Sequence, residues 1–168
     1  MSSTTDVSIH TDSKGLHIVT DSEGRANKPV FKNLELVFDV NEFNGSYVMV
    51  LNMDSDTSLF VHRLQSNIRA QDVPIEDIIK THGDKNQIKI KLPYHTKSSP
   101  YGEKYQPKFC MFKDDELVNL VNIKQVTPYL KRGAKLHVKC KMDKIFKYNG
   151  KFWPTLFAQE LKILPDNC

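Results

Sequence analysis

The sequence lacks the features that mark most enzymes and membrane proteins. None of the motifs G-x-x-x-x-G-K-[ST], G-x-G-x-x-G, G-x-S-x-G or H-E-x-x-H occurs in it, so nothing points to a phosphate-binding loop, a dinucleotide site, a serine nucleophile or a zinc protease. No apolar run is long enough to cross a bilayer, and the first residues have neither the basic start nor the apolar core of a signal peptide. We therefore expect no enzymatic activity, no cofactor and no membrane association.

Cysteine is also scarce, with only Cys110, Cys140 and Cys168 in the chain. They are far apart and odd in number, no C-x-x-C pair occurs, and the histidines do not fall at zinc-ligand spacing. We expect an intracellular protein with reduced thiols and no metal site.

The charge is unevenly distributed along the chain. From Lys104 onward there are 13 Lys and Arg against 6 Asp and Glu, whereas residues 1–103 carry 11 against 14. An acidic ligand is therefore expected on the carboxy-terminal half, although lysines also serve simply to solubilise exposed strands. The length favours one domain at residues 15–164. A Ser-, Thr- and Asp-rich disordered tail is expected at residues 1–14, and a short tail at residues 165–168.

Short apolar and β-branched segments predict an all-β domain with one or two short helices. Helices are missing between most strands, which favours a barrel or a sandwich over a parallel α/β fold. Residues 54–56 are interpreted as a turn, and residues 74–80 as the best short helix, because a proline and acids come early and a lysine late. Strands are expected at residues 15–20, 30–40, 47–53, 58–63, 87–92, 108–113 and 117–123, with a loop at 41–45 and a helical turn at 127–133 that ends at a glycine.

Residues 135–164 are the most informative stretch and resemble one long β-hairpin. Asn149-Gly150 predicts a two-residue turn between its strands, because both turn positions need positive φ. Side chains alternate along a strand with period two, so the apolar residues should face the core and the polar ones solvent. The expected core side is Leu136, Val138, Cys140 and Met142, and the expected outer side is His137, Lys139, Lys141 and Asp143.

The outer side of this strand is expected to form a ladder of cations. Its positions lie about 7 Å apart, close to the phosphate spacing of an extended single strand. Lys144, Lys147 and Lys151 continue the positive charge to the tip of the hairpin.

Aromatic residues crowd the same tip, namely Phe146, Tyr148, Phe152, Trp153 and, further along, Phe157. Rings exposed beside lysines stack nucleic acid bases, at about 1–3 kcal/mol per base and with little sequence preference. We expect Tyr148 and Phe152 to be exposed, because they flank the turn. For Trp153 and Phe157, a role in capping the barrel is equally consistent with the sequence.

Two further regions combine basic and aromatic residues. The long polar loop between Tyr94 and Lys108 includes Tyr105, and it is interpreted either as a flap over a bound strand or as a plain connector. Phe60, His62, Arg63 and Arg69 form a third and weaker cluster.

The order of these elements resembles that of OB-fold single-stranded-DNA-binding proteins, especially the replication-associated ones of large DNA viruses and T7-like phages. The resemblance covers about residues 87–164: a helical turn ending at Gly133, the lysine-rich strand, the aromatic and basic tip, and a last strand ending at Leu164. It implies a Greek-key OB-like β-barrel with an oligonucleotide across its face, held by lysines, arginines and stacked rings. Such proteins often end in a strongly acidic tail, whereas one acid follows Leu164 here, so we expect no partner-recruiting tail.

We predict a non-enzymatic protein that binds single-stranded DNA with little sequence preference and acts in replication, recombination or repair. Replication proteins and further copies of the chain are candidate partners. Two alternatives stay open: an RNA-binding OB module, and a viral or structural β-domain whose exposed aromatics bind protein. The predicted nucleic-acid-binding residues are Tyr105, Lys108, Arg132, Lys135, Lys139, Lys141, Lys144, Lys147, Tyr148, Lys151, Phe152 and Trp153.

Overall fold

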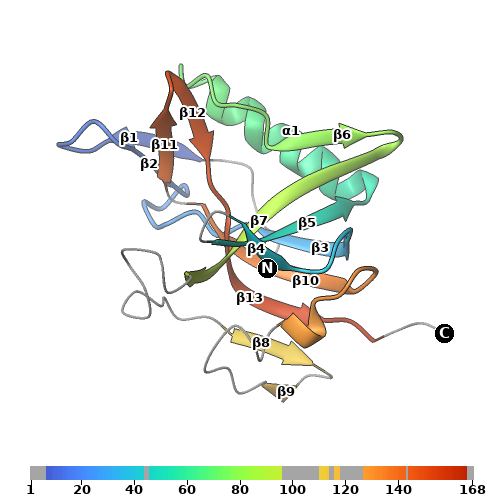
Figure 1. Cartoon of the computed structure of the whole chain (residues 1–168). Coiled ribbons are helices and arrows are strands. Elements are labelled where there is room, and N and C mark those ends of the chain that lie inside the picture. Colours follow the sequence, from blue (N-terminus) through green and yellow to red (C-terminus); the bar gives the residue numbers. More distant parts are fainter. Residues whose placement is uncertain are drawn as a thin grey trace.

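Five strands close into a β-barrel of OB type, as predicted (Figure 1). The computed structural model describes residues 7–43, 46–95, 110–113, 116–117, 127–142 and 144–165. Neighbouring strands are antiparallel in the order β7, β5, β3, β10, β13, and a parallel contact between Phe157 of β13 and Lys91 of β7 closes the ring. The five strands are β3 (Val30–Leu36), β5 (Ser46–Met53), β7 (Lys85–His95), β10 (Lys135–Lys141) and β13 (Phe157–Ile163).

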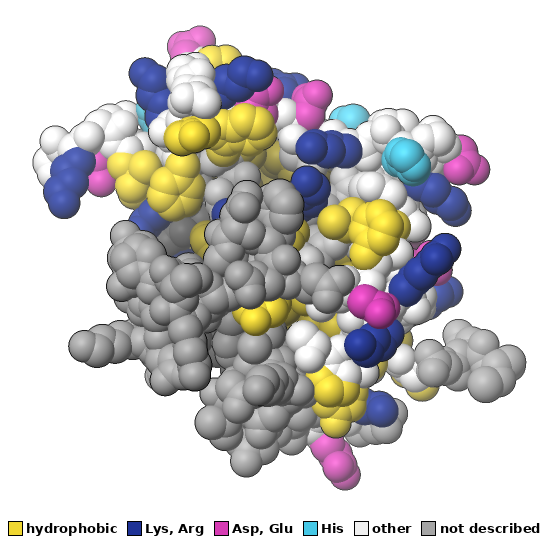
Figure 2. Space-filling view, viewed as in Figure 1, with side chains coloured by type: hydrophobic (Ala, Val, Ile, Leu, Met, Phe, Trp, Pro, Cys, Tyr) yellow, Lys and Arg dark blue, Asp and Glu magenta, His cyan; other side chains and the backbone are white. Residues whose placement is uncertain are grey.

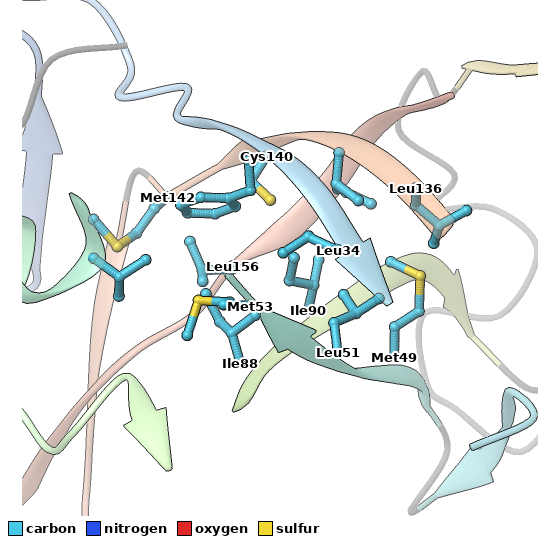
Figure 3. Packing of buried hydrophobic residues seen from close by; sticks show 14 of the residues in the cluster. Leu34, Met49, Leu51, Met53, Ile88, Ile90, Leu136, Cys140, Met142 and Leu156 are labelled. Atoms are coloured by element: carbon cyan, nitrogen blue, oxygen red, sulfur yellow. The ribbon is translucent and has the colours of Figure 1, made fainter. Parts of the chain in front are cut away.

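The inward side chains of these strands form the core (Figure 3). On β10 the buried set includes Leu136, Val138 and Cys140, as the alternation predicts. Burial strongly raises the pKa of the Cys140 thiol, in keeping with a core role. Each fully buried aliphatic side chain stabilises the fold by about 1.5–3 kcal/mol. The other barrel strands contribute Leu34, Leu36, Met49, Leu51, Met53, Ile88, Ile90, Leu92, Ala158 and Leu161.

A second sheet stands beside the barrel, with the order β1 (Ser8–Thr11), β2 (His17–Thr20), β11 (Lys144–Tyr148) and β12 (Lys151–Pro154) (Figure 1). Residues 135–164 are therefore not one continuous hairpin, because β10 pairs with β13 in the barrel while β11 and β12 pair in this sheet. Even-numbered residues are buried up to Met142, whereas the odd-numbered Ile145 is buried on β11. Between β10 and β11 the inward-facing positions therefore change from even-numbered to odd-numbered residues.

The strand β1 lies within the stretch for which we expected a disordered tail. It pairs with β2 across a turn in which the Asp12 carboxylate accepts hydrogen bonds from the backbone N–H groups of Lys14 and Leu16, at 2.9 and 2.8 Å. An Asp that bonds the backbone ahead of it is a common turn former, and this turn brings residues 8–11 into register with β2.

The predicted strand at residues 58–63 is wrong, because these residues lie in the helix α1 (Ser55–Arg69). Asp54 is the N-cap, and its carboxylate accepts from Thr57 N at 2.8 Å, so residues 54–56 begin a helix and are not an inter-strand turn. Val61, Leu64 and Ile68 are buried, with the spacing of one helical face. The sequence contains both signals, an Asp at the N-cap position and apolar residues spaced three and four apart.

The predicted helix at residues 74–80 is also wrong. The segment runs extended beside α1 and leads into β6 (Ile79–His82). Its backbone N–H groups donate to residues that are distant in sequence. Ile78 N donates to Gln65 Oε1 at 2.7 Å, and Glu76 N donates to Phe152 O at 2.8 Å. These bonds override the local helix propensity.

The remaining elements are short. β3 ends at Leu36, four residues earlier than expected, and β4 (Asn41–Phe43) pairs with β5 where we expected a loop. β8 (Cys110–Lys113) runs parallel to β13 and pairs with β9 (Glu116–Leu117), and the 3-10 turn η3 (Thr127–Tyr129) precedes β10. Most of the expected strand at 117–123 lies outside the described residues. Within the described parts, no helix is both long and apolar enough for a membrane span.

Candidate nucleic-acid interface

The tip of the β11–β12 hairpin presents a mixed aromatic and basic face, which we call the tip face. Asn149 and Gly150 form the predicted two-residue turn, with φ of 51° and 75°, as a type I′ turn requires. The register places Phe146 opposite Trp153 and Tyr148 opposite Lys151. Because alternate residues share a face, one side of the hairpin carries Lys144, Phe146, Tyr148, Lys151 and Trp153.

The rings of the tip face are accessible to a ligand. Phe146, Tyr148 and Trp153 are 42%, 69% and 41% exposed, and they make up three of the five large hydrophobic side chains exposed among the described residues. In Figure 2, hydrophobic and basic side chains meet at the top of the molecule, where Figure 1 places β11 and β12. Opposed aromatic residues on one sheet face stabilise the hairpin as well as offering a stacking surface.

The opposite side of the hairpin packs on the protein. Ile145 is buried, and Phe152, which we expected to be exposed, is half-buried against the core. The Phe152 ring lies 5.3 Å from the His17 ring, and Lys147 Nζ lies 5.7 Å from the Phe152 ring centroid. Phe152 and Lys147 therefore support the hairpin from behind the tip face.

On the β12 side of the tip face, the positive charge of Lys151 is partly offset by a nearby acid. Ile75 forms a parallel bridge with Phe152, which brings the segment after α1 alongside β12. Glu76 Oε1 then lies 3.9 Å from Lys151 Nζ. Lys144, on the other strand of the hairpin, is exposed and paired in register with Ile18 of β2, so the positive charge is strongest on the β11 side.

The predicted lysine ladder on β10 faces outward, but an acid stands opposite Lys139 and another opposite Lys135, which precedes the ladder on the same strand. Lys139 is paired in register with Glu160 of β13, and Lys135 with Glu35 of β3. Opposite charges at such cross-strand positions attract each other. The ladder is thus less positive than the sequence of β10 alone indicates.

A second basic and aromatic group, which we call the barrel row, lies on the outer face where the barrel closes. Phe157 of β13 is the register partner of both Lys91 on β7 and Lys141 on β10. The half-buried Phe157 ring thus stands between two lysines contributed by different strands. Further along β7, partial desolvation and the adjacent Lys80 ammonium lower the pKa of Lys89.

The other predicted residues are not part of these two groups. Lys135 is the first residue of β10, about 20 Å along the strand from Lys141 at 3.3 Å per residue, and Arg132 lies in the turn just before β10. Tyr105 and Lys108 lie outside the described residues. On α1, His62 and Arg63 are exposed while Phe60 packs edge-on against Phe31. Within the described ranges no group of His, Cys, Asp and Glu is arranged to hold a metal ion.

The predicted binding residues did not include Phe146, Phe157, Lys89 or Lys91. The alternation in residues 87–92 already placed both lysines on one face of a strand, but only the register with Phe157 makes Lys91 part of a group. Phe146 becomes recognisable as a surface ring once Ile145 is known to point inward.

Comparison with solved structures supports the fold over nearly the whole chain. The single-stranded DNA-binding protein from bacteriophage Enc34, in a C-terminally truncated form, aligns with a TM-score of 0.57 at 9% identity and covers 96% of both chains. A second structure of that protein gives 0.56 at 9% identity, over 97% of this chain and 92% of that one. Its complex with single-stranded DNA gives 0.54 at 8% identity, over 96% and 97%. No family model and no curated protein sequence matches.

Proposed function

We propose that this protein binds single-stranded DNA without catalysis and with little sequence preference, through the tip face and the barrel row. The observation that carries the proposal is the exposed pair of Phe146 and Trp153, held in register beside Lys144. Rings of this kind stack bases of any sequence, and lysines neutralise phosphates.

The place of these groups in the fold supports the same conclusion. OB-folds bind oligonucleotides on the face of their second and third strands and on the loops that join strands one to two and four to five. Here the third barrel strand is β7, which carries Lys89 and Lys91, and the β11–β12 hairpin joins the fourth strand to the fifth. Phe157 follows Trp153 by four residues, a span of at most about 14 Å, so we expect a DNA single strand that crosses Phe157 to reach the tip face as well.

The phage protein with the same fold is known in complex with single-stranded DNA. We infer a corresponding role for this chain within the cell, in replication, recombination or repair. RNA remains the second candidate ligand, because stacking rings and lysines do not distinguish ribose from deoxyribose; a contact to the 2′-hydroxyl would be needed.

The test is a fluorescence anisotropy titration of labelled oligo-dT over a series of salt concentrations. For single strands, the logarithm of the binding constant should fall with the logarithm of salt concentration by about 0.7 per neutralised phosphate. A Lys91→Gln/Lys144→Gln variant should therefore have a slope that is shallower by about 1.4 if each lysine neutralises one phosphate.

Lys85→Gln is the control, because Lys85 is exposed and is the first residue of β7, about 20 Å along the strand from Lys91. It should leave the slope unchanged. A slope of zero for the wild type would contradict the electrostatic part of the proposal. Competition by unlabelled oligo-U of equal length decides between DNA and RNA, and preferential binding of oligo-U would favour the second candidate.

A further inference from the structure

A groove at the other end of the barrel belongs to neither of the groups described above. It has a volume of about 380 Å³ and lies where η3 leads into β10, beside the carboxyl end of β13. Figure 1 shows this short orange helical turn below the barrel, with β11 and β12 at the top. The residues that define its character are Lys113, Tyr129, Lys131, Arg132, Ile163 and Leu164.

The rim of the groove is positively charged. Lys113, Lys131 and Arg132 line it, and no acidic residue does so among the described ones. Two acids among the described residues adjoin the groove and offset part of this charge: Asp39 accepts from the backbone N–H of Arg132 at 2.8 Å, and Glu116 is the register partner of Lys113 in the β8–β9 pair. Three cations around a small groove favour an anionic ligand.

The floor of the groove is apolar and held in place by the barrel. Ala134, Ile163 and Leu164 contribute to it. Ala134 O accepts from Leu36 N at 2.9 Å, Gly133 N donates to Leu36 O at 2.8 Å, and Leu164 N donates to Lys135 O at 2.9 Å. The groove is therefore preformed, which lowers the entropic cost of binding.

An apolar floor inside a cationic rim suits a peptide better than a nucleic acid strand. The Tyr129 ring is half-buried, and Lys113 Nζ lies 5.1 Å from its centroid, so it is less open to base stacking than the exposed Tyr148. Phe38, next in sequence to Asp39, is 62% exposed beside the same segment and adds apolar surface outside the groove.

We propose that this groove binds an acidic peptide segment of a partner protein, with one apolar side chain in the cavity and carboxylates on Lys113, Lys131 and Arg132. Arg132, which the sequence suggested as a phosphate contact, thereby acts in partner recognition. Because the tip face lies at the far end of the barrel, partner and nucleic acid bind at the same time.

The probe is a fluorescein-labelled peptide Asp-Asp-Glu-Phe-Glu-Asp-Asp, and its control has Ser in place of Phe at the same charge. The probe should bind the wild-type chain at least tenfold more tightly than it binds a Lys131→Glu/Arg132→Glu variant. The Ser peptide should bind more weakly than the Phe peptide, because the apolar side chain is missing. Lys85→Glu and the tip variant Phe146→Ala/Trp153→Ala should bind the probe as the wild type does.

Saturating oligo-dT should not displace the peptide. Displacement, or loss of peptide binding in the tip variant, would show that the peptide merely occupies the nucleic-acid face and would overturn the proposal. Equal binding of the Phe peptide to the wild type and to Lys131→Glu/Arg132→Glu would also overturn the proposal. So would a loss of oligo-dT affinity in Lys131→Glu/Arg132→Glu as large as the loss in the tip variant. A thermal melt checks folding, and Lys131→Gln/Arg132→Gln replaces the charge reversal if that variant unfolds. Peptide binding is measured without DNA. Failure of the wild type to bind oligo-dT would therefore refute the proposed function and leave the peptide proposal standing.

Discussion

Phe146 and Trp153 lie directly opposite each other on β11 and β12, and both side chains remain more than two-fifths exposed. Their position depends on what lies behind them. Ile145 and Phe152 point to the other side of the same two strands and pack on the protein, with the His17 ring 5.3 Å from Phe152. The exposed pair is thus a platform held by a packed hairpin.

The turn that joins these strands should control binding through geometry. Gly150 has φ of 75°, where a β-branched residue is strained by about 1–2 kcal/mol. We expect Gly150→Val to weaken oligo-dT binding in an anisotropy titration. Gly83→Val is the comparator, since Gly83 has φ of 63° in the two-residue β6–β7 turn. It should be destabilised to a similar extent in a thermal melt and keep its affinity, so an equal loss of affinity in both variants would argue against a specific role for the tip.

The helix α1 should depend on its N-cap. Asp54→Ala removes the acceptor for Thr57 N and should lower the free energy of unfolding in urea by about 1 kcal/mol. Asp56 lies in the first turn without being the cap, so Asp56→Ala should cost less. A larger loss for Asp56→Ala would show that the cap is not the main contribution.

The stability of the barrel should decline in mild acid through His137. Desolvation, followed by the charges of Lys162 and Lys32, lowers the pKa of His137 below 6.5, and its Nδ1 accepts a hydrogen bond from Asn33 N at 3.1 Å. The folded protein therefore takes up this proton less readily than the unfolded chain. Its contribution to stability is complete above about pH 6.5 and is lost as the pH falls below that value.

Urea unfolding at pH 7.5 and pH 5.5 measures this effect. The wild type should lose more stability between the two pH values than His137→Gln, whose side chain also offers an acceptor to Asn33 N but does not titrate. Identical losses would assign the acid sensitivity to other groups.

Local patterns in the sequence were sufficient for several features. Asn149-Gly150 predicted its turn because both residues have the positive φ that type I′ demands. The alternation through Leu136, Val138 and Cys140 predicted the inward side of β10, because a one-residue slip would turn the whole apolar set outward.

Other features depend on contacts that no local pattern contains. The strand predicted for the apolar run at residues 58–63 is wrong because short apolar runs do not distinguish strand from helix. Residues 74–80 are held extended by Gln65 and by the backbone of Phe152. The pairing of Lys139 with Glu160 arises only from strand register, which is why the predicted ladder looked more positive than it is.

The most direct test of the account is oligo-dT binding by Phe146→Ala/Trp153→Ala compared with Leu59→Ala. Leu59 is 50% exposed on α1, so this control removes a similarly exposed apolar side chain away from the tip. Each stacked base contributes about 1–3 kcal/mol, and 1.4 kcal/mol corresponds to tenfold in affinity. We predict at least tenfold weaker binding for the tip variant, with Leu59→Ala equal to the wild type. Equal affinity in all three proteins, with all three folded, would contradict a role for the tip face in binding single-stranded DNA.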